Sequence, residues 1–173
     1  GRMELRDETM AGNVEWIDGR SPGPVVLWGH NGHFRRGSHV LEEWDVKVPS
    51  MGEWLDDAYG AEYCPVAFEL GGGTVAALDG ETGGLVDYEI QEPPAESIPG
   101  VLRGTDESLC CLAVGELHDD PTIREWLRSE PERHNIWGGH PDGDHPVRYR
   151  PSDLTEFDWL LFVRDTEPMV PLE

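Results

Sequence analysis

The chain has 173 residues, which is enough for one domain with a single sizeable core. It carries 13 Lys and Arg against 35 Asp and Glu, giving a formal net charge of −22. Because such a surface repels phosphates, we expect neither a nucleic acid nor an anionic membrane as partner. With 38% hydrophobic residues and seven Trp, the chain is too apolar to be a disordered acidic tail. The apolar runs are too short for a transmembrane helix, and the sequence does not open with a signal-peptide pattern.

The charge distribution indicates the solvent in which the protein works. Carboxylates are spread along the whole chain, and Lys47 is the only lysine. An even acidic coat is typical of proteins in high salt, where screening removes self-repulsion. The composition resembles that of extremely halophilic archaea, and an ordinary acidic mesophile protein is the alternative. The three cysteines are odd in number and form no C-x-x-C, which excludes a disulfide framework or a zinc ribbon and predicts a cytoplasmic location.

The first third of the chain contains two predicted helices and one predicted strand. Apolar residues recur at helical spacing over residues 5–17, and Asp18-Gly19 supplies a stop signal. Residues 25–28, Val-Val-Leu-Trp, form a short continuous apolar run that predicts a strand buried on both faces. Residues 29–37 are predicted to be a polar loop. Residues 51–59 predict a second helix with Ser50 as its N-cap.

The remaining two thirds alternate between strand and helix patterns. Strands are predicted over residues 65–70, 74–78, 85–90, 109–114 and 157–163, and helices over residues 98–102 and 122–128. The second and third of these strands are spaced for a hairpin. Residues 131–151 are rich in Gly, Pro, Asp and His and predict a long loop. The alternation predicts an α/β class with a largely parallel sheet flanked by helices, in a single domain over residues 1–173.

The loop after the first predicted strand carries the strongest chemical signal. His30, Asn31 and His33 lie within four residues, and glycines let the backbone turn tightly between them. In open α/β sheets, ligands bind beyond the carboxyl ends of the strands. Two imidazoles placed there can converge on a metal ion or on a reacting oxygen. The alternative is structural: one histidine caps a strand and the other is solvated.

A carboxylate stands at the end of another predicted strand. Glu69 lies two residues before the triplet of glycines at residues 71–73. Beside a pair of histidines, it could orient an imidazole or act as a base. A solvated acid at the end of a strand is the alternative. The glycine triplet lacks the G-x-G-x-x-G spacing of a phosphate-binding loop.

A second cluster of histidines and acids lies in the predicted long loop. It comprises His140, Asp142, Asp144 and His145. Imidazoles and carboxylates this close could ligate a cation, but the segment lacks the spacing of an EF-hand loop. We favour a solvated loop. No serine lies in a G-x-S-x-G elbow between a predicted strand and a following predicted helix, so a serine hydrolase mechanism has no support.

Five segments resemble the erythromycin esterase-like family. Val25 to Phe34 is similar to its W-A-H-N-x-H-V signature, and the preceding segment around Arg6-Asp7 resembles the helix before it. Met51-Gly52-Glu53-Trp54-Leu55 matches an M-G-x-x-L helix. The segment F-E-L-G-G-G at residues 68–73 resembles F-E-F-G-E-G, and residues 157–163 resemble the last strand of that fold.

The resemblance covers the carboxyl-terminal part of a longer family fold, so we expect the chain to be a fragment or a truncated form. It implies hydrolysis of an ester or macrolactone by a histidine-activated water, without a covalent serine intermediate. In the family, a G-E-x-x-H-G motif supplies the activating histidine, and that motif is absent from these residues. The resemblance makes His30, His33 and Glu69 the candidate catalytic residues. Asn31 and Arg6 are the candidate substrate-binding residues.

The sequence therefore predicts an ester hydrolase whose substrate is a small-molecule ester, with no required cofactor and no metal ligands assigned. The isolated chain is expected to have negligible activity. The alternative is a catalytically inactive binding or assembly module of the same fold. A metal-binding module that uses His30, His33 and Glu69 is a third possibility. The sequence leaves the substrate and the oligomeric state open.

Overall fold

The structure is a computed structural model that describes residues 2–41, 46–79, 82–136, 147–151 and 154–168. The chain forms two compact units. Unit 1 comprises Gly1–Ala67 and Thr155–Trp159, and unit 2 comprises Phe68–Leu154 and Leu160–Glu173. Each unit is described separately below, and the single domain expected from the sequence stays a prediction.

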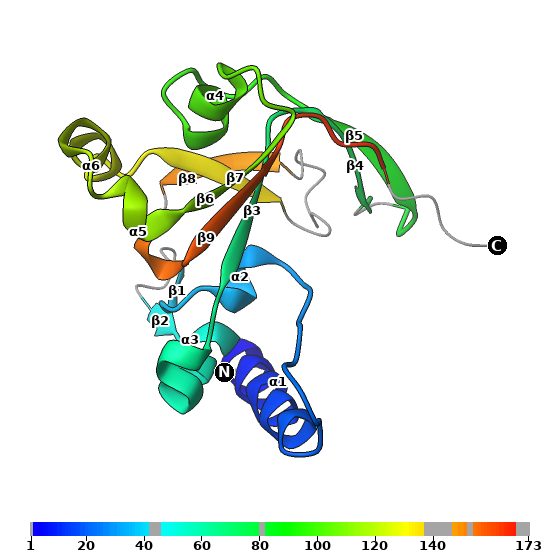
Figure 1. The fold of residues 1–173 in the computed structure, drawn as a ribbon. Coiled ribbons are helices and arrows are strands. Elements are labelled where there is room, and N and C mark those ends of the chain that lie inside the picture. Colours follow the sequence, from blue (N-terminus) through cyan, green and yellow to red (C-terminus); the bar gives the residue numbers. More distant parts are fainter. Residues whose placement is uncertain (1, 42–45, 80–81, 137–146, 152–153, 169–173) are drawn as a thin grey trace. The chain divides into compact units, whose positions relative to one another are not determined.

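Unit 1 is built from helices and one small antiparallel sheet (Figure 1). Its elements are α1 (Arg2–Asp18), α2 (Asn31–Phe34), β1 (His39–Leu41), β2 (Val46–Val48), α3 (Met51–Tyr59) and the 3-10 turn η2 (Gly60–Glu62). The two longer helices confirm the sequence predictions. Ser50 caps α3, as predicted, by accepting a hydrogen bond from the Glu53 N–H at 3.0 Å. The predicted polar loop contains α2, a single helical turn.

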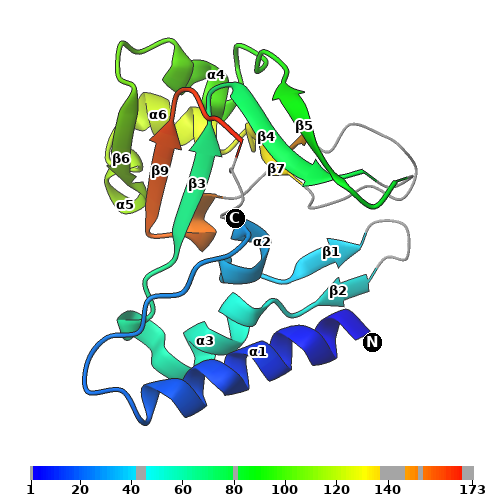
Figure 2. The same cartoon turned by 90° about the vertical axis from the view of Figure 1, so that its right-hand side faces the viewer.

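The core of unit 1 lies between α1 and α3, which run side by side (Figure 2). Ala11 and Val14 of α1 pack against Met51 and Leu55 of α3, all four being buried. The i, i+3 and i, i+4 spacings put each pair on one face of its helix. The helices therefore form one apolar layer that anchors the loop between them.

The strand predicted over residues 25–28 is wrong. The segment is extended but belongs to no strand of the structure, and Val26 and Trp28 are 90% and 80% exposed. Leu27 faces the core of unit 1. An apolar run becomes a strand only when a neighbouring strand accepts its backbone hydrogen bonds, and no described strand pairs with this segment.

Unit 2 contains a three-stranded sheet with the order β3-β9-β6 (Figure 1), formed by β3 (Val66–Leu70), β9 (Trp159–Val163) and β6 (Leu109–Ala113). The Gly71 N–H donates to the Val163 carbonyl at 2.8 Å, which joins the carboxyl ends of β3 and β9, so these strands are parallel. The Arg164 N–H, after β9, donates to the carbonyl of Ser108, before β6, so β6 is antiparallel to β9. Phe162, in the central strand, is fully buried.

The other strands of unit 2 pair as antiparallel ribbons. β4 (Gly73–Leu78) pairs with β5 (Leu85–Ile90), which confirms the predicted hairpin. β7 (Glu132–Ile136) pairs with β8 (Val147–Pro151). The described sheets are therefore mostly antiparallel, and the mixed α/β class holds without the largely parallel sheet that the sequence predicted. The alternation of helix and strand patterns misled because β1, β4 and β7 each pair antiparallel with the next strand along the chain, and antiparallel pairing needs no helical crossover.

Three short helices complete the unit: α4 (Ile98–Arg103), α5 (Val114–Leu117) and α6 (Pro121–Leu127), with the 3-10 turn η3 (Leu154–Glu156) at the unit boundary. The long loop predicted over residues 131–151 is wrong at both ends, because β7 and β8 occupy them. The candidate cluster at His140, Asp142, Asp144 and His145 lies outside the described residues. Gly73 begins β4 with a φ of 98°, and a Cβ there would collide with the backbone of Thr166, so only glycine fits.

Candidate active site

His30 caps the short helix α2. Its Nδ1 atom accepts a hydrogen bond from the Gly32 N–H at 3.0 Å. An imidazole nitrogen that accepts carries no proton, so neutral His30 holds its proton on Nε2 and can donate from there. Asn31 begins α2 and is half-buried. His30 therefore caps a helix, whereas the structural alternative from the sequence was a histidine that caps a strand.

His33 has the opposite arrangement of donor and acceptor. Its Nδ1 atom lies 3.0 Å from Oδ2 of Asp7, and its Nε2 atom lies 3.3 Å from Nη2 of Arg6. An ionised carboxylate only accepts and a guanidinium only donates. Neutral His33 therefore carries its proton on Nδ1 and presents a lone pair at Nε2. The rings of His30 and His33 lie 6.3 Å apart, edge to face.

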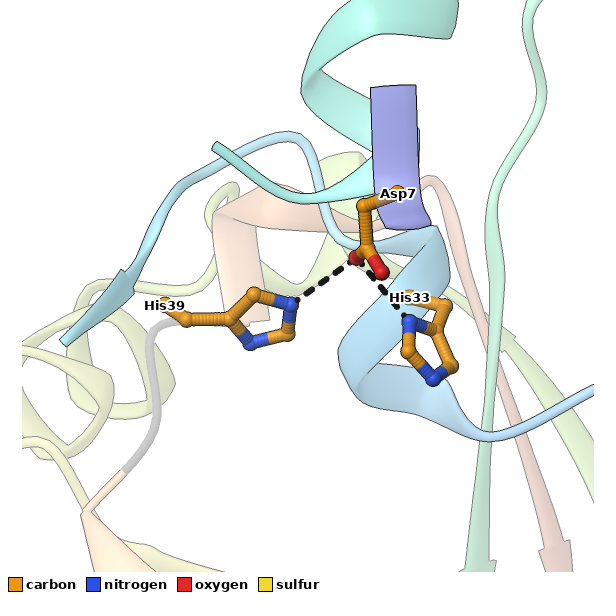
Figure 3. A group of neighbouring side chains, drawn as sticks. All are labelled: Asp7, His33 and His39. Atoms are coloured by element: carbon orange, nitrogen blue, oxygen red, sulfur yellow. Dashed lines mark hydrogen bonds and ion pairs between the residues drawn. The ribbon is translucent and has the colours of Figure 1, made fainter. Parts of the chain in front are cut away.

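Asp7 holds two imidazoles at once (Figure 3). Its side chain is fully buried, while those of His33 and His39 are 22% and 16% exposed. Nε2 of His39 lies 3.2 Å from the same Oδ2 atom, which also accepts the Met51 N–H at 3.1 Å. Oδ1 accepts from Nε of Arg6 at 3.2 Å. Both carboxylate oxygens are thus committed to donors.

The segment that carries these histidines is fixed against α3. The Oγ atom of Ser50 donates to the Arg35 carbonyl at 2.7 Å. A Cβ on Gly52 would collide with the backbone of residues 34 and 35, so the glycine of the M-G pair allows close packing there. Arg36 pairs with Asp56 and Asp158 at 2.9 and 2.8 Å. Helix α3 therefore positions His33 through its first turn.

The cluster shifts two pKa values in the same direction. Burial opposes the ionisation of Asp7, but hydrogen bonds from His33, His39 and Arg6 outweigh it and hold the pKa of Asp7 below its ordinary value. For His39, burial lowers the pKa and outweighs the hydrogen bond to Asp7. At neutral pH the cluster therefore combines a charged Asp7 with an uncharged His39.

The same three side chains could hold a metal ion by their chemistry. One ligand atom of each of Asp7, His33 and His39 lies within 4.8 Å of the others, and two imidazoles with a carboxylate are a known donor set. Two further observations oppose a divalent cation. The amino-terminal end of α3 donates to Asp7 through Met51, and the Arg6 guanidinium contacts both Asp7 and His33. The arrangement fits protons on the two imidazoles better than a metal ion.

Glu69 occupies a second cluster, inside unit 2. Its buried carboxylate accepts from Nε of Arg133 at 2.8 Å and from Nδ1 and the backbone N–H of His134 at 2.6 and 3.0 Å. These contacts outweigh the effect of burial and lower the pKa of Glu69. Glu69 thus orients an imidazole, as the sequence suggested, but the imidazole is that of His134. The carboxylate that orients His33 is Asp7.

Asp7 was not among the candidate site residues predicted from the sequence, although a signal was present. Residues 7, 11 and 14 follow helical spacing, and Ala11 and Val14 are buried. An acid on the buried face of a helix requires donors, because an unpaired buried charge is costly. His39 offered no such signal, since it lies in a three-residue strand that the sequence did not predict.

Comparisons with solved structures define the class of fold. The chain is similar to a Bacillus cereus protein (TM-score 0.73, 17% identity) and to a succinoglycan biosynthesis protein (TM-score 0.71, 18% identity). It is also similar to a mutant of erythromycin esterase EreC in its open conformation (TM-score 0.61, 17% identity). The matches cover 94% of this chain and 37–38% of the other chains, so it spans well under half of their length. No curated protein matches the chain.

The mixed α/β fold, with helices around small sheets, is thus that of erythromycin esterase-like structures. The family model for erythromycin esterase matches residues 1–166. The chain belongs to the erythromycin esterase family. In the described part of the chain, no helix combines the length and the apolar character needed to cross a membrane.

Proposed function

We propose that this chain forms part of an ester hydrolase and supplies the groups that orient water and bind the ester carbonyl. The observation that carries the proposal is that two neighbouring imidazoles have opposite hydrogen-bond partners, from which opposite protonation follows. Nε2 of His30 is a donor and Nε2 of His33 is an acceptor, as their partners Gly32 and Asp7 require. An ester carbonyl needs a donor, and an attacking water needs an acceptor.

In this proposal Arg6 moves from Nε2 of His33 toward the carbonyl oxygen of the ester, because that nitrogen has a single lone pair. Nε2 of His33 then accepts a hydrogen bond from the attacking water, and His30 donates to the carbonyl oxygen. Arg6 lies beside His33 with its side chain half-exposed, so its guanidinium can stabilise the negative charge that develops on that oxygen. Asn31 is a further contact for the substrate. Glu69 supports the fold through Arg133 and His134 rather than contacting the substrate.

The reaction needs one more group. A base removes a proton from the water, the water oxygen bonds to the carbonyl carbon, and the carbonyl electron pair moves to oxygen. Collapse of the intermediate then breaks the bond to the leaving alkoxide, which takes the proton back. In the family the base lies in the G-E-x-x-H-G motif, which these residues lack. We therefore expect the chain alone to hydrolyse esters no faster than free imidazole.

The test uses the 173-residue chain in molar salt with an aryl methylphosphonate monoester, whose tetrahedral anion mimics the oxyanion. We expect binding that is tighter than that of the planar carboxylate analogue, as transition-state mimics require. Arg6→Gln and His33→Gln should each weaken it about tenfold, the loss of roughly one charge-assisted hydrogen bond. Lys47→Gln, a change on the β1–β2 hairpin, is the matched control and should leave binding unchanged.

Two results would contradict the proposal. Equal affinity for the phosphonate and the carboxylate would favour the non-catalytic binding module. Rapid hydrolysis of a nitrophenyl ester by the isolated chain, lost in His30→Ala, would show that the chain already contains the base. A reading frame upstream that encodes G-E-x-x-H-G would support the complete enzyme.

A further inference from the structure

We propose that Asp7 is a positioning residue that holds His33 with its proton on Nδ1. The lone pair of Nε2 is thereby left to accept from Arg6 in this structure, and from an incoming water once Arg6 moves to the substrate. This inference rests on the proposed function for its use in hydrolysis. The protonation of His33, however, can be measured without any substrate. It depends on contacts within unit 1 alone, between α1, α2, β1 and the start of α3.

The side chain of Asp7 is held in one orientation. It lies on the buried face of α1, and its side chain is fully buried. Its Oδ2 atom accepts from His33, His39 and Met51 at 3.0, 3.2 and 3.1 Å. The Met51 N–H is the first of a nine-residue helix and has no acceptor inside that helix. The carboxylate is therefore held by backbone as well as by side chains.

Only one neutral tautomer of His33 can form hydrogen bonds with both Asp7 and Arg6. With the proton on Nδ1, the ring donates to Asp7 and accepts from Arg6. With the proton on Nε2, a lone pair would face the carboxylate and an N–H would face the guanidinium. Both contacts would then be repulsive. The partner of one ring nitrogen thus decides what the other can do.

His39 is the second imidazole that donates a hydrogen bond to Asp7. The charged and titratable groups near it are Asp7, His33 and Arg35. Its hydrogen bond to Asp7 comes from Nε2, and an uncharged donor leaves the negative charge of Asp7 in place. His39 therefore shares Asp7 with His33 without neutralising it. Removing His39 should leave the bond between Asp7 and His33 intact.

The test is ¹⁵N NMR of the full chain with labelled histidine, at neutral pH and in molar salt. His33→Gln identifies the signals of His33. We expect intact His33 to show a protonated Nδ1 and an unprotonated Nε2. A protonated Nε2 in the unmutated chain would overturn the inference directly, with no variant needed.

Variants then assign the cause. In Asp7→Asn the amide oxygen can still accept from the three donors that face Oδ2, so we expect the protonated Nδ1 to persist. In Asp7→Ala the acceptor is lost and the preference for Nδ1 should be lost with it. His39→Leu, the matched control, removes a partner of the same oxygen and should leave His33 unchanged. Loss of the preference in His39→Leu, or its retention in Asp7→Ala, would overturn the inference.

The last experiment distinguishes imidazoles that carry protons from imidazoles that bind a metal ion. Addition of Zn²⁺ to the unmutated chain should leave the Nδ1 proton of His33 in place. One bound Zn²⁺ per chain, with loss of the protons on Nδ1 of His33 and Nε2 of His39, would overturn the inference in favour of a metal site. Failure of phosphonate binding would affect only the proposed hydrolysis, because none of these spectra involves a substrate.

Discussion

Asp7 in unit 1 and Glu69 in unit 2 are both buried carboxylates that accept from an imidazole, but their partners differ in exposure. The partners of Glu69, Arg133 and His134, have side chains only 5% and 3% exposed. Those of Asp7 reach solvent: Arg6 is 54% exposed and His33 is 22% exposed. We call Glu69 with Arg133 and His134 the closed cluster, and Asp7 with Arg6, His33 and His39 the open cluster. Buried side chains like those of the closed cluster can only stabilise the fold, whereas partly exposed ones can also contact a ligand. The comparison therefore favours a structural role for Glu69 and agrees with the proposed positioning role of Asp7.

The largest expected effect comes from the closed cluster. Glu69→Gln would leave the Arg133 guanidinium buried without an opposite charge, which typically costs about 3–5 kcal/mol. For a chain of this size the melting temperature should fall by about 6–20 °C. Thermal unfolding followed by circular dichroism measures this shift.

An exposed ion pair supplies the matched control for Glu69. Asp165→Asn removes the partner of Arg103, a pair in the same unit whose side chains are substantially exposed. Its unfolding free energy should change by no more than about 0.5 kcal/mol. If Glu69→Gln proved as mild as Asp165→Asn, the closed cluster would not stabilise unit 2, and the contrast with Asp7 would fail.

The second prediction uses pH to separate the titration of His39 from that of the two buried carboxylates. A group whose pKa is lowered by folding stabilises the protein above its ordinary pKa, and this contribution is lost as the pH falls through the lowered value. His39, with an ordinary value of 6.5, therefore predicts a first loss of stability below about pH 6.5. Asp7 and Glu69, with ordinary values of 3.8 and 4.5, predict a second loss at lower pH. Unfolding free energies from pH 8 to pH 3 would show both stages.

His39→Gln tests the assignment of the upper stage to unit 1. Gln keeps a donor that can reach Asp7 but does not titrate. The difference in stability between this variant and the unmutated chain should therefore change between pH 7 and pH 5 and then level off. A difference that stays constant with pH would mean that His39 is not the titrating group.

Local patterns in the sequence predicted the parts of the fold that depend on local contacts. The helical spacing of apolar residues in α1, the Ser50 cap of α3 and the hairpin of β4 and β5 all depend on neighbours within a few residues. The strand predicted over residues 25–28 failed because its pattern says nothing about whether a partner strand lies beside it. β7 was missed because its sequence, Glu-Arg-His-Asn-Ile, is polar and its pairing with β8 fixes it.

In the candidate site too, the sequence predicted what depends on local patterns and missed what depends on tertiary contacts. His30 and His33 could be identified from a compact motif, and Arg6 from the resemblance. The carboxylates could not be assigned to their imidazoles, because Asp7 is 26 residues from His33 and Glu69 is 65 residues from His134. Such pairings depend on tertiary packing, which a spacing rule along the chain does not contain. The sequence therefore indicated the chemical groups of the site but not their partners.

The smallest expected effect is the loss of unfolding free energy when a serine N-cap is removed, and we compare one such serine in each unit. Ser50 caps α3 and donates to the Arg35 carbonyl, and Ser97 caps α4 and donates to the Pro94 carbonyl. Because both are buried and make the same two kinds of hydrogen bond, Ser50→Ala and Ser97→Ala should each cost about 1 kcal/mol. Urea unfolding of the two variants measures this cost.

Removal of the two serine caps should differ in its effect on the imidazoles of unit 1. Ser50 ties the first turn of α3 to the segment that carries His33, and that turn also supplies the Met51 N–H to Asp7. We therefore expect Ser50→Ala to broaden or shift the ¹⁵N signals of His33 and His39, and Ser97→Ala to leave them unchanged. Equal shifts in both variants would mean that the open cluster responds to global stability rather than to the packing of α3. In that case the helix would not position the imidazoles, and only the contact with Asp7 would remain to hold them.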